Sequence, residues 1–377
     1  MLSAGEASGD RHAASLFREL QKILPGVRGI GMGGAAMREA GIDLRFDSSG
    51  IGVIGLAEIA RHYGEIRGAL KLMCQLARDE RPDLLICVDY KEFNFRLAKA
   101  AKALGIKVLF YVSPQVWAWR QGRVKSYGQI IDHMALIFPF ELPFYEKHGV
   151  PATYVGHPLA GKVNAIEPRP TVRAGLGVTD DRTALVGMLP GSRTNEVARL
   201  LPTLLDAAVK VRDLHADAQF VVFRAPTLDA TALKEAGSAR GLALHVIEGQ
   251  NYDVLGACDA VMTVSGTATL EVALMGVPMV IVYRLASLSY WIGRLLVKVP
   301  FIGLPNILSG KGIVREFIQH EATAENIAGE INHILDDPEY RGMMRQDLAN
   351  VREILGHREG SVELAQLAAR MLKGQSL

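Results

Sequence analysis

Three short segments of this sequence have residue types that could bind an anion. Residues 5–10 (GEASGD), 189–193 (LPGSR) and 265–271 (SGTATLE) each follow an apolar, strand-like run and lead into a helix-like stretch. Free backbone N–H groups at the start of such a helix attract a phosphate or a carboxylate. Because the segments lie in both halves of the chain, they indicate two facing α/β domains with an anionic ligand in the cleft between them.

Asp89 is the candidate general base. It ends the apolar run of residues 84–88, so its carboxylate should lie at the carboxyl edge of a sheet. Partial burial there would raise its pKa and suit it to accept a proton. The pattern alone supports an alternative equally well, in which Asp89 caps the helix that begins near Phe93.

The second half of the chain supplies candidates for holding a diphosphate and a ribose. Arg193 has a planar guanidinium that suits a diphosphate, and Gly191 lets the backbone approach it closely. Glu271 lies one helical turn after Thr267, so Thr267 could contact phosphate while Glu271 accepts hydrogen bonds from ribose hydroxyls. The alternatives are a surface ion pair of Arg193 with Glu196 and, for Glu271, a favourable place near the positive end of a helix.

Two apolar features could contact a lipid. Trp117 follows another strand end; a packed position with a satisfied N–H is the leading interpretation, and contact with a sugar or an acyl chain is the alternative. Residues 56–78 predict a helix whose apolar face spans roughly 160°, wider than the roughly 100° that a core-facing helix needs. It could lie on an anionic membrane surface or be buried between a sheet and its partner domain. The predicted membrane or acyl-chain contacts are Ile59, Ile66, Leu70, Met73 and Trp117.

Composition narrows the class of protein. The chain has 377 residues, and at about 150 residues per domain this suggests two or three domains. Lys and Arg number 42 against 40 Asp and Glu, which does not support a polycation for nucleic acid. The three cysteines are far apart without a CxxC pair, as in a protein of the reducing cytoplasm, and no apolar run is long enough to span a bilayer. No metal site is predicted, because no two aspartates stand one residue apart.

Strand-like and helix-like patterns alternate along the whole chain. The continuous apolar runs are typical of parallel strands buried on both faces. Expected strands are residues 2–4, 29–32, 84–89, 107–112, 134–138 and 153–155, then 184–189, 219–223, 242–247, 260–264 and 278–283. With a linker at 160–171, the pattern predicts Rossmann-like, doubly wound domains at 1–160 and 171–345. Residues 346–377 are expected to be helical and could pack back on the first domain.

Together these motifs resemble the lipid-A-disaccharide synthase family. The resemblance covers nearly the whole chain in order: residues 5–10, Asp89 with 93–94, 111–120 (YVSPQVWAWR), 155–158 (VGHP), 189–193, 265–271 and 304–306 (LPN). The block around Trp117 is highly specific. The resemblance implies a GT-B glycosyltransferase with two Rossmann-like domains, a nucleotide held mainly by the second, and no metal or other cofactor. Two departures are a first strand several residues shorter than in other members and a less usual segment at 90–92.

The resemblance also implies the reaction. 2,3-Diacylglucosamine would pass from its UDP form to the 6-hydroxyl of 2,3-diacylglucosamine 1-phosphate, giving a β-1,6-linked lipid A disaccharide and UDP. Asp89 is the expected base, with Glu6, Ser8 and Asp10 orienting the acceptor or Asp89. The expected UDP contacts are Gly191, Ser192, Arg193, Ser265, Gly266, Thr267, Glu271 and Asn306.

The resemblance places such an enzyme in the cytoplasm on the inner-membrane surface, possible as a homo-oligomer and without a nucleic-acid partner. Two other functions remain open at this point. A UDP-sugar 2-epimerase of the same fold would act on a UDP-sugar alone. A non-catalytic carrier would bind UDP or lipid without releasing UDP.

Overall fold

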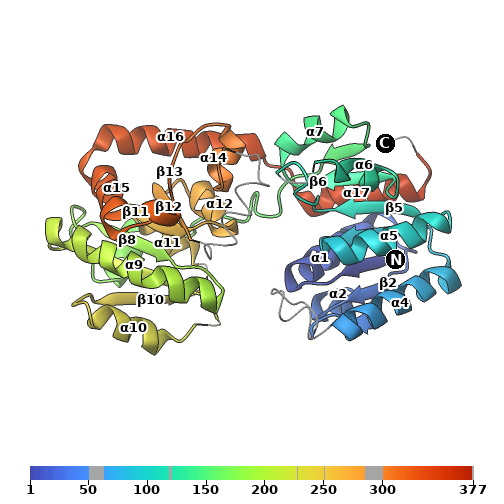
Figure 1. The fold of residues 1–377 in the computed structure, drawn as a ribbon, viewed down its shortest axis with the longest axis horizontal. Helices are drawn as coiled ribbons and strands as arrows, with labels where there is room; N and C mark the ends of the chain where they lie inside the picture. The colour runs from blue at the N-terminus through green and yellow to red at the C-terminus, as the bar shows by residue number, and fades with distance from the viewer. Residues whose placement is uncertain (51–62, 119–120, 227, 250, 285–299, 376–377) are drawn as a thin grey trace. The chain divides into compact units, whose positions relative to one another are not determined.

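Two parallel β-sheets organise the chain, one in each of two units (Figure 1). The computed structural model describes residues 1–50, 63–118, 121–226, 228–249, 251–284 and 300–375. Unit 1 comprises Met1–Ala160 and His357–Leu377, and unit 2 comprises Gly161–Gly356.

Unit 1 contains a seven-stranded sheet in the order β3-β2-β1-β4-β5-β6-β7, with every adjacent pair parallel. Its strands are β1 (Leu2–Ala4), β2 (Ile30–Gly33), β3 (Asp43–Asp47), β4 (Leu84–Val88), β5 (Lys107–Tyr111), β6 (His133–Leu136) and β7 (Ala152–Tyr154). Its helices are α1 (Ala7–Ile23), α2 (Ala35–Glu39), α4 (Tyr63–Glu80), α5 (Lys91–Ala103), α6 (Arg123–Gly128), η1 (Pro139–Glu141), α7 (Leu142–Lys147) and α17 (Gly360–Leu372).

Unit 2 contains a six-stranded sheet in the order β10-β9-β8-β11-β12-β13, again with every adjacent pair parallel. Its strands are β8 (Leu185–Leu189), β9 (Gln219–Arg224), β10 (Leu244–Glu248), β11 (Ala260–Val264), β12 (Met279–Tyr283) and β13 (Arg315–Ile318). Its helices are α8 (Arg169–Gly175), α9 (Thr194–Leu214), α10 (Ala230–Ser238), α11 (Tyr252–Ala257), α12 (Thr267–Leu274), α14 (Leu304–Ser309), η2 (Gln319–Glu321), α15 (Ala324–Asp336) and α16 (Pro338–Leu355).

The sheet of unit 1 is covered on both faces. Leu85 and Cys87 of β4 belong to the apolar cluster that includes α4 and α5, whereas Ile86 and Val88 belong to the cluster that includes α1 and α17. This alternation explains why a central strand is apolar at every position. Each fully buried Leu or Phe side chain contributes about 1.5–3 kcal/mol to folding. The last helix, α17, drawn red, packs on the blue α1 in this unit (Figure 1).

Strand order reverses at one place in each sheet. In unit 1 the chain proceeds from β1 to β2 and β3 on one side, and from β4 to β7 on the other. In unit 2 the corresponding central strands are β8 and β11. Loops that leave two such strands diverge, and ligands of doubly wound sheets bind at this topological switch point. The expectation of two doubly wound parallel sheets is confirmed.

Two edge strands were missed by the sequence prediction. The β3 strand alternates between exposed and half-buried residues, and β13 is equally polar. Both lie at the edge of their sheets, where a strand has a hydrogen-bonded neighbour on one side only. Neither strand is a continuous apolar run, which is the pattern that predicts a strand buried on both faces.

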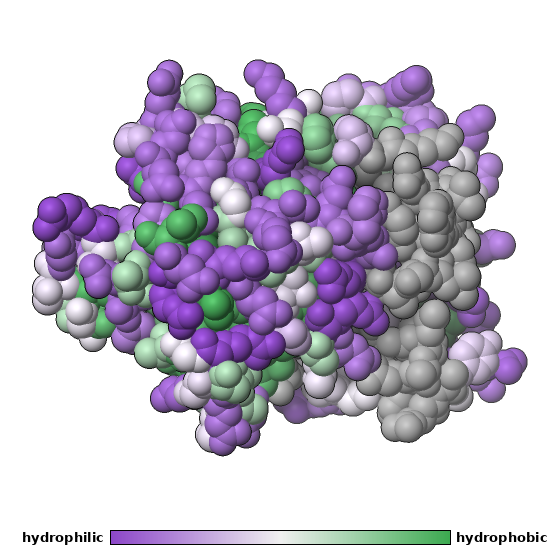
Figure 2. All heavy atoms as spheres, turned by 60° about the vertical axis from the view of Figure 1, so that its left-hand side comes forward, coloured by the Kyte–Doolittle hydropathy of each residue, from purple (hydrophilic) through white to green (hydrophobic). Residues whose placement is uncertain are grey.

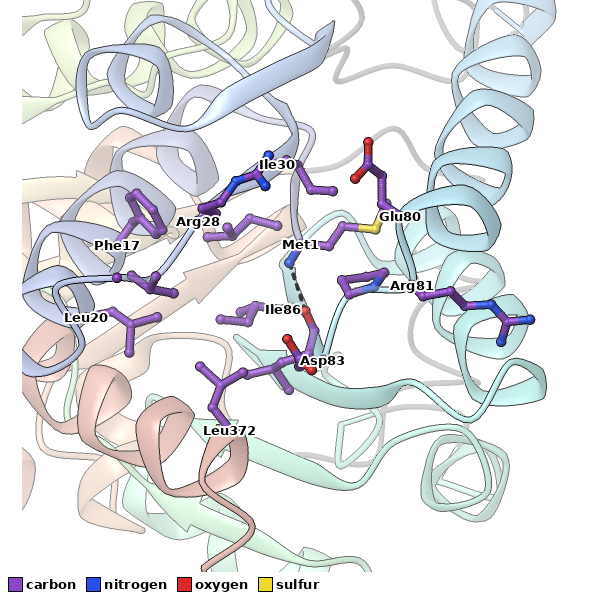
Figure 3. Close-up of a pocket in the computed structure, with 15 residues that line it drawn as sticks. Met1, Phe17, Leu20, Arg28, Ile30, Glu80, Arg81, Asp83, Ile86 and Leu372 are labelled. Carbon is purple, nitrogen blue, oxygen red and sulfur yellow. Dashed lines mark hydrogen bonds between the residues drawn. The ribbon is translucent and has the colours of Figure 1, made fainter.

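A cavity of about 340 Å³ lies at the amino ends of β1, β2 and β4 (Figure 3). There the buried amine of Met1 donates a hydrogen bond of 2.8 Å to the carbonyl of Leu84. Burial lowers the pKa of this amine to about 5. Because the cavity lies at the edge of the sheet opposite the predicted motifs, we assign it no catalytic role.

The visible face in Figure 2 is mostly hydrophilic, with small, separate apolar patches among the described residues. None of the helices within the described ranges combines the length and the apolar character that crossing a membrane requires.

Asn94, in the first turns of α5, joins the central strands of unit 1. Its buried amide nitrogen lies 2.7 Å from the carbonyl oxygen of Asp89 and 3.3 Å from those of Val88 and Ser3. Its amide oxygen accepts a hydrogen bond of 2.7 Å from the Ser3 hydroxyl. One side chain thus fixes the backbone on both sides of the switch point.

Replacing Asn94 with Ala should destabilise unit 1. Buried carbonyls and a hydroxyl would lose their partner, which should lower the free energy of unfolding by about 1–3 kcal/mol. Urea denaturation followed by circular dichroism would measure this. The exposed Asn350→Ala on α16 serves as the control, and equal stability of both variants would refute the role given to Asn94.

Candidate active site

The carboxyl edge of the unit 1 sheet contains strained backbone. Asp89 and Tyr90, directly after β4, have φ values of 48° and 47°, and Val112, directly after β5, has 65°. Residues other than glycine rarely adopt a left-handed backbone conformation, and for a β-branched residue such as Val112 it is an outlier. Such strain costs about 1–3 kcal/mol per residue and concentrates at functional sites. The loops after β4 and β5 are therefore the first candidates for a site.

The Asp89 carboxyl group has the properties of a general base. Burial raises its pKa, while the Lys91 charge and the Tyr90 N–H partly oppose this effect. A carboxylate with a raised pKa accepts a proton more readily. The residue at the N-cap of α5 is Tyr90, so the capping alternative for Asp89 does not apply.

The turn of residues 5–10 packs against this loop. A Cβ atom added to Gly5 would lie 2.3 Å from the Tyr90 ring, so only glycine permits this close approach. Glu6 is the N-cap residue of α1, and its charge adds to the effect of burial in raising the Tyr90 pKa. Ser8 is half-buried in the first turn of the same helix. Glu6 and Asp89 thus lie on adjoining loops.

Asp10 has a different environment. Its carboxylate accepts backbone hydrogen bonds from Gly34 at 2.7 Å, Ala36 at 3.0 Å and Met37 at 3.1 Å. Both carboxylate oxygens are therefore used to fix the start of α2. These contacts give Asp10 a structural function, unlike the orienting role expected from the sequence.

The loop after β5 is held by a residue that the sequence analysis missed. The Trp117 Nε1 donates a hydrogen bond of 2.9 Å to Oε1 of Glu141, and the Trp117 ring packs edge-on against Phe140. Glu141 is 2 % exposed. Burial raises its pKa to about 7, against the hydrogen bonds of Ser113, Phe138 and Trp117. The N–H of Trp117 is satisfied, in agreement with the leading interpretation of this residue.

A small cavity of about 220 Å³ lies beside the Asp89 loop. It is lined by residues of α4, of α5 and of the loop before α5: apolar and aromatic side chains, three cations and one carboxylate, Glu92, which is paired with Arg123. They are Tyr63, Ile66, Arg67, Leu70, Tyr90, Lys91, Glu92, Phe93 and Arg96. A cavity of this composition suits an acyl chain close to an anionic group.

The other predicted lipid contacts have different positions. Met73 is 0 % exposed and packs in the core of unit 1. The expectation that it contacts a membrane therefore does not fit its position, because the apolar face of α4 is partly used for folding. Ile59 lies outside the described residues.

In unit 2, the loop after β8 leads into the start of α9. Gly191 has a φ of 104°, and a Cβ atom there would lie 2.5 Å from Oε2 of Glu196. Arg193 is exposed and occupies the N-cap position of α9, directly after Ser192. Burial raises the Glu196 pKa, and the Arg193 charge opposes this effect. The guanidinium and the helix start together favour an anion.

The loop after β11 leads into α12 in the same way. Gly266 and Thr267 are exposed at the start of the helix, and the Ser265 hydroxyl donates to the Ile302 carbonyl over 3.2 Å. Glu271 is 2 % exposed and accepts a hydrogen bond of 3.0 Å from the Tyr252 hydroxyl. Tyr252 was missed because nothing in its own sequence context indicates the contact.

Asn306 is 0 % exposed and bonded internally. Its amide nitrogen donates to Oε1 of Glu316 at 2.7 Å and to the Val314 carbonyl at 2.9 Å, and its amide oxygen accepts from Val314 N at 3.0 Å. Glu316 also accepts from the backbone N–H groups of Ile302 and Gly303. Since both amide hydrogens are used, Asn306 fixes a loop instead of offering a donor to a ligand.

The described residues thus form one group in each unit. In unit 1, Glu6, Ser8 and Asp89 follow β1 and β4, and in unit 2, residues 191–193 and 265–271 follow β8 and β11. Among the described residues, no group of three or more His, Cys, Asp or Glu side chains could hold a metal ion.

Comparisons with known proteins agree on one family. The family model for lipid-A-disaccharide synthetase matches residues 1–371. The lipid-A-disaccharide synthase of Nitrosococcus oceani is 49% identical over 374 residues, covering 99% of this chain and 96% of that protein. The enzyme of the same name from Geobacter sulfurreducens is 46% identical over 375 residues, covering 100% and 97%.

Solved structures share the GT-B fold at low identity. The calicheamicin glycosyltransferase CalG4 superposes with a TM-score of 0.63 at 15% identity, covering 99% of this chain and 96% of that one. A UDP-GlcNAc 2-epimerase from Neisseria meningitidis, bound to UDP-GlcNAc, gives a TM-score of 0.59 at 11% identity and covers 98% of each chain.

Proposed function

The chain belongs to the lipid-A-disaccharide synthase family, and we propose that it transfers 2,3-diacylglucosamine from UDP to the 6-hydroxyl of 2,3-diacylglucosamine 1-phosphate. One observation carries the proposal: in each sheet, the candidate residues follow the two strands at which the strand order reverses. The products are UDP and a β-1,6-linked disaccharide 1-phosphate.

In the proposed reaction, Asp89 removes the proton of the acceptor hydroxyl. The hydroxyl oxygen then forms a bond to the anomeric carbon as the bond from that carbon to UDP breaks, with inversion of configuration. The raised pKa of the Asp89 carboxyl group supports this role. General-base catalysis contributes about 10²–10⁴-fold in rate. Glu6 and Ser8 are assigned to orienting the acceptor, because their loop packs against that of Asp89.

The leaving UDP is assigned to unit 2. Arg193 and the backbone N–H groups at Gly266 and Thr267 stabilise the negative charge that develops on the diphosphate. Gly191 and Ser192 belong to the loop after β8, and Ser265 belongs to the loop after β11. These residues are therefore assigned to the same UDP site. Glu271 accepts hydrogen bonds from the ribose, with Tyr252 holding its carboxylate. Asn306 is assigned to positioning the neighbouring loop.

The cavity beside Asp89 is assigned to the acceptor lipid. Its apolar lining suits an acyl chain, and Arg67, Lys91 and Arg96 suit the 1-phosphate. The same cations and the exposed ring of Tyr63 favour peripheral association of α4 with the anionic inner-membrane surface.

Mass spectrometry after incubation with the UDP donor, the 1-phosphate acceptor or both tests the function. The disaccharide should form only when both are present, and EDTA should not reduce its rate. Conversion of the donor alone would instead identify an epimerase, and binding of UDP without its release would identify a carrier.

Two variants should separate the roles of the units in this assay. Asp89→Asn should lower kcat by about 10²–10⁴-fold and leave the Kd of UDP unchanged in calorimetry. Arg193→Ala should weaken UDP binding by about 10–100-fold, since a charge-assisted hydrogen bond contributes about 1.5–3 kcal/mol. The exposed Asp43→Asn and Arg182→Ala are the controls. Near-normal turnover of folded Asp89→Asn would reject the assigned base.

The pH dependence should respond to Lys91. Its positive charge stabilises the Asp89 carboxylate, so Lys91→Gln should raise the Asp89 pKa further. The acidic limb of kcat/KM should then move to higher pH. Lys99→Gln, which removes an exposed charge from the same helix, should leave the limb in place. A shift to lower pH for Lys91→Gln would contradict the assignment.

The lipid cavity can be tested on α4. Replacing both Ile66 and Leu70 with Ser should raise the KM for the acceptor and reduce co-sedimentation with anionic vesicles, because both residues line the cavity. Leu72→Ser, exposed on the same helix but outside the cavity, is the matched control. Unchanged KM and vesicle binding of the double variant would exclude this surface.

A further inference from the structure

Glu141 is a buried carboxylate whose role the proposed reaction does not explain. It ends the short helix η1 after β6 and is almost completely inaccessible to water. A carboxylate in such a place must be satisfied by hydrogen-bond donors. Its Oε1 accepts from the Ser113 hydroxyl and, at 2.9 Å, from the Trp117 indole N–H. Its Oε2 accepts from the backbone N–H of Phe138 at 3.3 Å.

The two side-chain donors belong to the loop of residues 112–118, which follows β5. This loop begins at Val112, whose φ of 65° is unfavourable for a β-branched residue. Strained backbone persists only where surrounding contacts hold it. Glu141 provides such contacts at two positions of the loop, one directly after Val112 and one at Trp117.

The same loop adjoins Asp89. Strands β4 and β5 are paired so that Val88 lies opposite Tyr111. The Asp89 N–H donates to the Tyr111 carbonyl at 3.0 Å, one residue before the strained Val112. Lys91 lies close enough for its charge to act on both Asp89 and Glu141. A shift of the loop would therefore change the position and the electrostatic surroundings of Asp89.

We propose that Glu141 is a positioning residue for the transfer reaction, holding the loop of residues 112–118 beside Asp89 through Ser113 and Trp117. This inference rests on the proposed function. Glu141 does not touch substrate in this role. It acts through the loop, in which the half-buried Trp117 is bonded to Glu141 and packs against Phe140.

The charge of Glu141 belongs to this mechanism. Burial raises its pKa to about 7, and the groups that face it are Ser113, Trp117, Lys91 and Tyr145 together with the backbone of Phe138. The ionised form can accept all three hydrogen bonds. The protonated form must donate from one oxygen and so loses an acceptor. The loop is thus held best when Glu141 is ionised, above its pKa.

Steady-state kinetics with both substrates test the proposal. Glu141→Ala should lower kcat by at least about 20-fold, because a small displacement near the reacting atoms is costly. Its KM for the UDP donor should not change. Glu141→Gln keeps one acceptor oxygen and should lose only about 3- to 10-fold. We expect kcat of the native protein to fall as the pH drops through about 7, where Glu141 takes up a proton, and Glu141→Gln should lack this component of the fall. Glu146→Ala, exposed on the next helix, is the control.

Trp117→Phe keeps the aromatic ring but removes the N–H, and it covers the case in which Glu141→Ala does not fold. It should lower kcat several-fold, and its effect should not add to that of Glu141→Gln. Native kcat in folded Glu141→Ala or Trp117→Phe, or an unchanged pH profile in Glu141→Gln, would overturn the proposal. The native protein in the same assay tests the proposed function separately. Only a failure of the native protein to form the disaccharide would refute that function.

Discussion

The reversal of strand order in each parallel sheet is the constraint on which the candidate site depends. The connections that follow two neighbouring central strands lead to opposite sides of the sheet at this point. The loops therefore diverge, and their backbone N–H groups and side chains are available to a ligand. In unit 1 these strands are β1 and β4, and in unit 2 they are β8 and β11. The short polar segments that hold the candidate residues directly follow these four apolar strands.

Strain at the carboxyl edge of unit 1 is balanced by buried polar contacts. Asp89 and Tyr90 both have left-handed backbone, which open solvent would not maintain. The Asn94 amide below them, the Tyr111 carbonyl beside them and the Gly5 turn against the Tyr90 ring together define the loop. Packing and hydrogen bonding thus offset the conformational cost of this left-handed backbone. As a result, the Asp89 carboxylate is held in a partly buried position.

The sequence predicts the central parts of the molecule better than its periphery. Strands β4, β8 and β11 are buried on both faces and apolar except at Thr263, and their ends predicted Asp89 and the two helix starts of unit 2. Edge strands β3 and β13 lack this signal. The partners Glu141, Tyr252 and Glu316 could not be predicted, because each contact joins residues from different elements. For the same reason the internal bonds of Asp10 and Asn306 and the burial of Met73 became evident only in the fold.

The two units differ in the kind of charge that they stabilise. Around Asp89, burial disfavours the ionised carboxylate, so the group gains from taking up a proton. At the starts of α9 and α12, the Arg193 guanidinium and the positive end of each helix favour negative charge. A transfer in which a hydroxyl loses a proton and a diphosphate leaves needs both environments. The environment of the base depends on desolvation, whereas that of the diphosphate depends on hydrogen-bond donors that a ligand can reach. Because the two environments lie on separate sheets, neither requirement weakens the other.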